Sequence, residues 1–283
     1  MKKLIILSLV FLTAFFYSLV PKSSVGTSVL NGVTHGTDDY LVMSEPVAQA
    51  GVLGDGADDY ISITTTAALE DHSSGLTVSF WIKFTSVTDE TVISKHDQAS
   101  PSTNGWVFFI YNSHWYFQLR VDDTCCQGAE AASGPTAGVW YHVVLWWDMT
   151  DGKLYVDGTE ETNFSATGTL TSTDDIWVLS NVDSGGVYFV NAEVTDLRQY
   201  NRALSTTEIS ELYTSRLKFP FEAGGTKPDA CWPMDDQPDG TSYDGDTVID
   251  RCGSSNGTGV DGANNTGLTA KAETYLMHPG GVS

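Results

Sequence analysis

Short apolar runs separated by turn-forming residues recur along the chain, and this pattern is typical of β-strands. The strongest example is a pair of runs at residues 139–147 and 153–157, which are rich in aromatic and β-branched side chains. The Asp151-Gly152 pair between them suits the positive φ angles of a tight hairpin turn. The sequence therefore predicts a hairpin whose second strand ends at the Asp157-Gly158 pair.

The run at residues 76–84 alternates strictly between two faces. Val78, Phe80 and Ile82 belong to one face, which we expect to lie in the core, whereas Trp81 belongs to the other. An aromatic side chain on the second face predicts that this face is covered as well, as in a strand of a sandwich.

Other segments with strand character are short and evenly spaced. They lie at residues 40–44, 91–95, 106–111, 115–121, 176–179, 187–190 and 193–200, with a hairpin loop at 112–114 and a polar loop at 122–138. The sequence therefore predicts an all-β fold, an antiparallel sandwich or jelly roll. One short helix follows, because Ser205 and Glu208 form a capping-box pattern ahead of Ile209 and Leu212.

Length and charge restrict the function. The chain has 283 residues with 14 basic and 36 acidic side chains, and its net charge of −22 excludes nucleic acid as a partner. At the N-terminus two lysines precede a largely apolar run at residues 4–20. We interpret residues 1–25 as a signal peptide or an N-terminal anchor, and we expect no other membrane contact. Both alternatives predict a secreted or cell-surface protein.

Three segments carry a resemblance to a known family. The hairpin contains W-Y-H-V and L-Y-V-D-G, residues 55–61 read D-G-A-D-D-Y-I, and residues 197–209 contain Y-N-R-A-L-S followed by E-I. They resemble the laminin-G-like members of the concanavalin A-like lectin/glucanase family, although Gly54 stands where the family pattern has phenylalanine. The resemblance implies a concanavalin A-like jelly-roll domain over residues 38–217. It leaves the function open, since this fold serves binding modules and enzymes alike.

The acidic turn is a candidate metal site. Asp55, Asp58 and Asp59 offer the carboxylate oxygens that calcium prefers. The resemblance implies that an aspartate of the closing strand, here Asp196, approaches this turn to coordinate calcium. The alternative is that these aspartates only bond the backbone amides of their own turn, and the sequence does not decide between the two.

Four aromatic side chains on two neighbouring predicted strands are candidates for stacking on sugar rings. They are Trp106, Tyr111, Trp115 and Tyr116. Burial in the sandwich is the alternative for each of them.

No catalytic residue is predicted. His142 lies within an aromatic strand without a partner nucleophile in any motif, so we interpret it as a histidine of the sheet. Glu193 and Asp196 lack the spacing and the third acid of the carboxylate motif that glucanases of this fold use.

Four cysteines in an exported chain predict disulfides. Cys125 and Cys126 are adjacent, and neighbouring cysteines rarely bond to each other. Two arrangements stay open: Cys231 bonds to Cys252, or both of these cysteines bond to the 125–126 loop.

The tail at residues 218–283 contains C-W-P-M-D-D and, further on, I-D-R-C-G-S-S-N-G-T. These segments resemble the opening strand of a further laminin-G-like module. We predict that the tail adds a strand to a sandwich, in its own chain or in a neighbour, where exchange between chains would give self-association. A passive extension pinned by a disulfide is the alternative.

These observations leave three classes of function. We expect an exported, non-catalytic module that binds glycan or an extracellular protein, with calcium as its candidate cofactor. A structural surface or filament subunit assembled through the tail is the alternative, and a glycoside hydrolase on the same fold is the third class.

Overall fold

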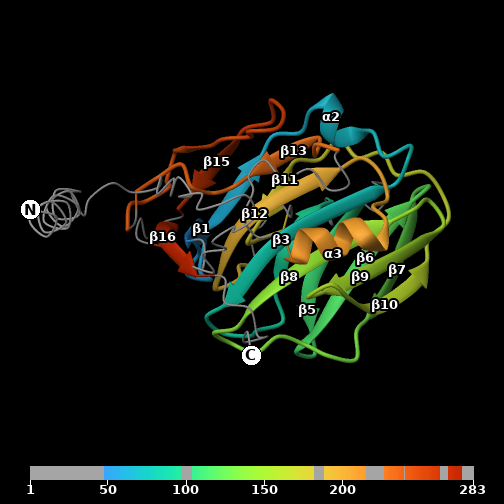
Figure 1. Cartoon of the computed structure of the whole chain (residues 1–283), viewed down its shortest axis with the longest axis horizontal. Coiled ribbons are helices and arrows are strands. Elements are labelled where there is room, and N and C mark those ends of the chain that lie inside the picture. Colours follow the sequence, from blue (N-terminus) through green and yellow to red (C-terminus); the bar gives the residue numbers. More distant parts are fainter. Residues whose placement is uncertain are drawn as a thin grey trace, which may run out of the picture. The chain divides into compact units, whose positions relative to one another are not determined.

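Two antiparallel sheets make up the fold in the computed structural model of the chain (Figure 1). The structure describes residues 48–96, 104–181, 188–214, 226–238, 240–261 and 267–275. The side chains of residues 48–50, 125 and 272–275 are outside this description, as are the predicted N-terminal segment and the predicted strand at residues 40–44. Residues 46–283 form one compact unit. Among the described residues no helix has the length and apolar character needed to cross a bilayer.

The first sheet has the order β10-β9-β8-β3-β12-β1-β16, and β13 also pairs with β12. Its strands are β10 (Thr159–Ser165), β9 (Asp151–Val156), β8 (Trp140–Trp147), β3 (Leu76–Phe84), β12 (Ala192–Tyr200), β1 (Ala48–Leu53), β16 (Thr269–Tyr275) and β13 (Ala230–Trp232). The predicted hairpin is confirmed as β8 and β9, and β8 also pairs with β3.

The second sheet has the order β14-β15-β2-β11-β4-β5-β6-β7. Its strands are β14 (Thr247–Val248), β15 (Gly257–Val260), β2 (Tyr60–Ile63), β11 (Ile176–Val178), β4 (Thr91–Lys95), β5 (Gly105–Tyr111), β6 (His114–Val121) and β7 (Thr124–Glu130). With both sheets antiparallel, the predicted all-β sandwich is confirmed.

The core lies between the two sheets and is built by strand alternation. Phe80 of β3 points inward, as predicted, and so does Phe84; the two rings meet Phe108 and Trp115 of the second sheet. The Phe80 and Phe108 rings pack edge to face with centroids 5.7 Å apart. These large side chains fix how the second sheet lies against the first.

The opposite face of β3 is covered by the predicted helix, α3 (Thr206–Thr214), which lies across the first sheet in Figure 1. Trp81 is 3 % exposed and packs against His142 and Tyr213. The capping box is confirmed, because the Ser205 amide donates to Glu208 Oε2 at 2.7 Å and the Glu208 amide donates to Ser205 Oγ at 3.3 Å. A shorter helix, α2 (Ala67–Glu70), precedes β3.

Two predictions about loops and strands are wrong. The segment predicted as a polar loop at residues 122–138 contains the strand β7. A two-residue turn precedes it, with φ of 49° at Asp122 and 55° at Asp123, a conformation that aspartate tolerates well. The strand predicted at residues 187–190 is absent from residues 188–190, where Val190 instead donates its amide to the Leu179 carbonyl at 3.1 Å.

The turn of the central hairpin also differs from the prediction. Asp151-Gly152 already belongs to β9, and the positive φ lies at Met149 with 75°. The Asp148 carboxylate explains this, because its Oδ1 accepts hydrogen bonds from the amides of Thr150 and Asp151 at 3.0 and 2.8 Å. The side chain of Asp148 therefore closes the turn ahead of the predicted Asp151-Gly152 position.

The tail adds strands to both sheets of its own chain. The prediction had left open whether it would pack in its own chain or in a neighbour. Strand β13 pairs with β12, β15 pairs with β2, and β16 pairs with β1. The Cys231–Cys252 disulfide closes the segment that follows β13, so the arrangement with both tail cysteines bonded to the 125–126 loop is wrong. Trp232 and Tyr243 are completely buried. The tail is thus part of the sandwich.

Candidate functional site

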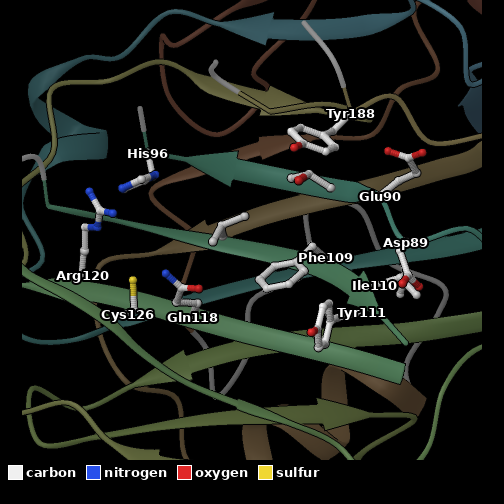
Figure 2. A pocket seen from close by; sticks show the side chains of 12 residues that line it. Asp89, Glu90, His96, Phe109, Ile110, Tyr111, Gln118, Arg120, Cys126 and Tyr188 are labelled. Atoms are coloured by element: carbon white, nitrogen blue, oxygen red, sulfur yellow. The ribbon is translucent and has the colours of Figure 1, made fainter. Parts of the chain in front are cut away.

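A groove of about 510 Å³ lies on the outer face of the second sheet, over β4 to β7 (Figure 2). Aromatic, polar and charged side chains line it together: Asp89, Glu90, Thr91, His96, Val107, Phe109, Ile110, Tyr111, Gln118, Arg120, Cys126 and Tyr188. The groove lies on the face of the sheet that points away from the core.

Strand alternation explains which side chains reach the groove. Trp106, Phe108 and Ile110 of β5 point into the core, so the residues between and after them point outward. Phe109 and Tyr111 are two of these outward residues. On β6 the same alternation brings Gln118 and Arg120 to the outer face, and Gln118 lies directly opposite Val107 of β5.

The aromatic part of the groove is built by two neighbouring strands. Phe109 stacks on Tyr116 with ring centroids 4.6 Å apart, and Tyr111 meets Tyr116 edge to face at 6.2 Å. Tyr111 is 48 % exposed and Tyr188 is 42 % exposed, so both offer ring surface to a ligand.

Polar groups lie at both ends of the groove. Figure 2 shows Asp89 and Glu90 at the end near Tyr111, and His96, Arg120 and Cys126 at the other end. The carboxylate of Asp89 accepts hydrogen bonds from the amides of Asn112 and Ser113, each at 3.0 Å, and so holds the turn between β5 and β6. Burial, followed by the charge of Asp89, raises the pKa of Glu90.

The four aromatic residues predicted for sugar stacking separate into two pairs. Trp106 and Trp115 are each 1 % exposed and belong to the core, so their predicted exposure is wrong. Tyr111 and Tyr116 lie on the outer face, in the groove and directly beside it. Phe109 was not among the residues predicted from the sequence. The period of two along β5, anchored on an inward Phe108, is the signal that would have identified it.

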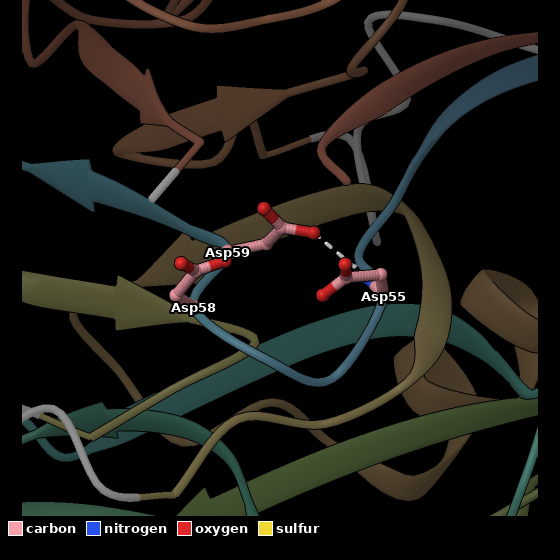
Figure 3. A group of neighbouring side chains, drawn as sticks. All are labelled: Asp55, Asp58 and Asp59. Atoms are coloured by element: carbon pink, nitrogen blue, oxygen red, sulfur yellow. Dashed lines mark hydrogen bonds between the residues drawn. The ribbon is translucent and has the colours of Figure 1, made fainter. Parts of the chain in front are cut away.

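The acidic turn brings three of the four predicted metal ligands together (Figure 3). One carboxylate oxygen of each of Asp55, Asp58 and Asp59 lies within 4.8 Å of the others. The Asp55 amide donates to Asp59 Oδ2 at 2.8 Å, and the Ala57 amide donates to Asp55 Oδ1 at 2.7 Å. Gly56 has a φ of 81°, and a Cβ there would lie 2.9 Å from the Cβ of Asn191. Glycine is therefore required at this turn.

Asp196, the fourth predicted metal ligand, does not join this group. Its carboxylate accepts two hydrogen bonds from Arg198, both at 2.7 Å, within β12. The neighbouring acid of the sheet, Glu193, forms an ion pair with Lys83 at 2.6 Å. His142 is buried with its Nε2 2.9 Å from Ser79 Oγ, under the helix that covers this sheet.

Asp59 is only 1 % exposed and sits in a negative environment. Burial, together with the charges of Asp55 and Asp261, raises the pKa of Asp59 to about 7. Asp261 follows β15 in the tail, far from the turn in sequence, and was not predicted as its neighbour.

Cys126 is exposed, lines the groove and is disulfide-bonded. Because Cys231 and Cys252 bond to each other, the disulfide of Cys126 does not involve the tail.

Comparison with known proteins identifies the fold. The family model described as "Concanavalin A-like lectin/glucanases superfamily", Laminin_G_3, matches residues 55–210. A Bacteroides ovatus protein proposed to bind carbohydrate has a TM-score of 0.56 and 16% identity, with 81% of this chain and 62% of that one covered. A heptameric SAP-like pentraxin from Limulus polyphemus has a TM-score of 0.47 and 16% identity, covering 59% of this chain and 82% of the pentraxin.

The binding domain of botulinum neurotoxin serotype D has a TM-score of 0.47 and 17% identity, covering 59% of this chain and 42% of that domain. At these identities the structural matches show similarity of fold alone. Among curated proteins, none matches the sequence significantly.

Proposed function

The chain belongs to the concanavalin A-like lectin/glucanase superfamily, and from this membership and the groove we propose that it is a non-catalytic module that binds glycan outside the cell. The proposed binding site is the groove over β4 to β7.

One observation carries this proposal: exposed aromatic rings gather in a groove that also contains polar side chains. A pyranose ring presents C–H groups on its faces and hydroxyl groups around its edge, so it fits an aromatic surface flanked by hydrogen-bonding groups. Tyr111 and Tyr188 are two of the four large apolar side chains that are exposed in the described part of the chain. Both line this groove.

The groove is also rigid, which favours binding. Phe109, Gln118 and Arg120 project from paired strands, so their backbone positions are fixed by the ladder before a ligand arrives. Little conformational entropy is then lost on binding. Aromatic side chains held in place by a sheet therefore support the proposal of a binding module whose affinity comes from preformed contacts.

Two features support a location outside the cell. Disulfides persist in oxidising compartments, and the chain has the Cys231–Cys252 bond and a disulfide at Cys126. The apolar run at residues 4–20 after two lysines has the composition of an export signal or anchor.

A glycoside hydrolase is the second candidate, because the carboxyl groups of Asp89 and Glu90 line the groove and the pKa of Glu90 is raised. Such an enzyme needs two carboxyl groups that flank the scissile bond. Both carboxylate oxygens of Asp89 already accept hydrogen bonds from backbone amides of the turn, and the described groove residues include no acid besides Asp89 and Glu90. We therefore favour binding over hydrolysis.

A glycan array tests the proposal. The purified protein and its Tyr111→Ala variant are compared on the array, with Val139→Ala as the control, because Val139 is 43 % exposed but does not line the groove. We expect the wild type to bind a defined set of oligosaccharides, the control to bind the same set, and Tyr111→Ala to bind about tenfold more weakly.

Two results would contradict the proposal. One is equal binding by Tyr111→Ala and the wild type. The other is cleavage of a bound oligosaccharide that is lost in Glu90→Gln, which would establish the hydrolase instead.

A further inference from the structure

Three partly exposed aromatic side chains outside the groove form an aromatic stack: Tyr60 of β2, Trp177 of β11 and Phe189. The rings of Tyr60 and Trp177 are nearly parallel, with 10° between their planes and centroids 4.5 Å apart. Phe189 stacks on Tyr60 with centroids 6.3 Å apart and planes 25° apart. Tyr60 thus contacts both other rings and joins them into one surface.

The register of the second sheet places this stack on the same face as the groove. Trp177 lies directly opposite Ser94 of β4, and Ser94 lies opposite Val107 of β5, which lines the groove. Directly opposed residues of an antiparallel pair project from the same face. Ile176 and Val178, the neighbours of Trp177 along β11, point into the core, in agreement with an outward Trp177.

The stack and the groove are close enough for one ligand to contact both. Trp177 and Val107 lie two strands apart, which is about 10 Å at the ordinary strand spacing. Tyr188 and Phe189 are adjacent in the chain and connect the two surfaces, because Tyr188 lines the groove and Phe189 belongs to the stack. Figure 2 shows Tyr188 on the side of the groove opposite Tyr111.

Trp177 and Tyr60 carry polar groups that are available to a ligand. The indole N–H of Trp177 and the hydroxyl of Tyr60 form no hydrogen bond with the residues that the structure describes, and both atoms reach solvent. The buried Trp147 and Trp232 instead donate their indole N–H groups to backbone carbonyls at 2.7 and 2.8 Å. A partly exposed ring with an unused polar group suits an amphipathic ligand such as a sugar.

We propose that the aromatic stack is a second sugar-binding surface beside the groove, and that the ligand is a linear oligosaccharide long enough to contact both. This inference rests on the glycan binding proposed above. The three side chains of the stack are uncharged, which favours a neutral sugar. The C–H face of such a sugar packs against the ring of Trp177, and its hydroxyl groups reach the indole N–H and the hydroxyl of Tyr60.

A second surface makes the affinity depend on the length of the ligand. A sugar unit that reaches the stack adds contacts without a second loss of translational and rotational freedom. Tyr60 and Trp177 project from paired strands, so their backbone positions are fixed before the ligand arrives. Affinity therefore rises with chain length until the oligosaccharide spans both surfaces, and longer chains gain little more.

The test is a calorimetric titration of the purified protein with size series of neutral linear oligosaccharides. The probes are glucose, mannose and xylose oligomers of two to eight units. We expect the wild type to bind the long members of at least one series about tenfold more tightly than the disaccharide. Trp177→Ala should bind the long members as weakly as the disaccharide, and its binding of the disaccharide should be unchanged.

Trp140→Ala is the matched control, because Trp140 is also a partly exposed tryptophan but belongs to the first sheet. It should keep the length dependence of the wild type. Tyr111→Ala separates this inference from the proposed function, since Tyr111 lines the groove itself. It should weaken the binding of short and long oligomers alike.

Two results would overturn the second surface and leave the groove intact: affinity that does not depend on length, and unchanged binding of long oligomers by Trp177→Ala. Binding of other glycans on the array without binding of any of the three series would also overturn it. A wild type that binds no glycan at all would overturn both proposals. If Trp177→Ala fails to fold, Phe189→Ala tests the same stack, since Phe189 lies outside the strands. A length dependence that survives Phe189→Ala would then count against the stack.

Discussion

Phe109 and Tyr116 are direct partners across β5 and β6, and their rings stack with the planes 24° apart. The ladder that pairs the two strands therefore also positions the two rings. This stack lies beside the exposed ring of Tyr111 and on the outer face of the sheet, away from the core. An aromatic surface that is fixed by backbone pairing is a rigid base for a ligand.

Substitutions on the two faces of the second sheet should differ in how much they lower the free energy of unfolding. Trp115→Ala removes a fully buried ring that packs against Phe84 and Phe108, and should lower the free energy of unfolding by about 3–5 kcal/mol. Tyr111→Ala removes a ring that is half exposed, and should lower it by less than about 1 kcal/mol. Urea denaturation of both variants measures the difference. A large loss in Tyr111→Ala would mean that this ring supports the fold.

The capping box of α3 predicts a pH-dependent stability. The Arg202 guanidinium, which donates to Glu208 at 2.7 and 3.1 Å, is the main reason that the pKa of Glu208 falls to about 2. Because this pKa is lower in the folded chain than in the unfolded one, the contribution is complete above about pH 5. It is lost as the pH falls towards 2.

We therefore predict that Glu208→Gln lowers the free energy of unfolding by about 1–2 kcal/mol at pH 7 and has little effect near pH 2.5. Denaturation at both pH values measures this change, with Asp123→Asn as an exposed control. An equal loss at both pH values would show that the charge of Glu208 does not contribute.

The tail should be necessary for a stable sandwich. Truncation after Lys227 removes β13, β14, β15 and β16, and with them the buried side chains of Trp232 and Tyr243. It also exposes the edges of β1 and β2, which invites aggregation. We predict a melting temperature at least 10 °C lower, or an insoluble product, because several kcal/mol of apolar burial are lost.

Light scattering of the full chain tests where the tail packs. The strand pairs within the chain predict the mass of a single chain in solution. A mass of two or more chains that disappears on truncation would instead support exchange of the tail and the filament subunit. An unchanged melting temperature after truncation would make the tail a passive extension.

Much of the fold follows from local patterns that the sequence displays. The alternation in β3, the hairpin of β8 and β9 and the capping box of α3 each depend on residues close together in the chain, and all three are confirmed. The turn before β7 was missed, because two adjacent aspartates indicate a loop as readily as a two-residue turn. Only pairing with β6, a contact between strands, distinguishes the two.

The candidate sites depend on long-range register, which explains why only part of them could be predicted. Tyr111 was identified from its residue type. That Tyr111 faces the groove whereas Trp106 faces the core becomes clear only when the face of each strand is known. Asp261 meets Asp59 only because β15 pairs with β2, and no local pattern connects them. Asp196 was expected there from a family resemblance, whereas in this chain Arg198 binds its carboxylate.

The most direct test of glycan binding in the groove is calorimetric titration of the strongest array oligosaccharide into three proteins. These are the wild type, Val139→Ala and the double variant Tyr111→Ala, Tyr188→Ala. The account predicts equal affinity for the first two and at least about a hundredfold weaker binding by the double variant, since it loses both exposed rings of the groove. Binding by the double variant with the affinity of the wild type would contradict the account.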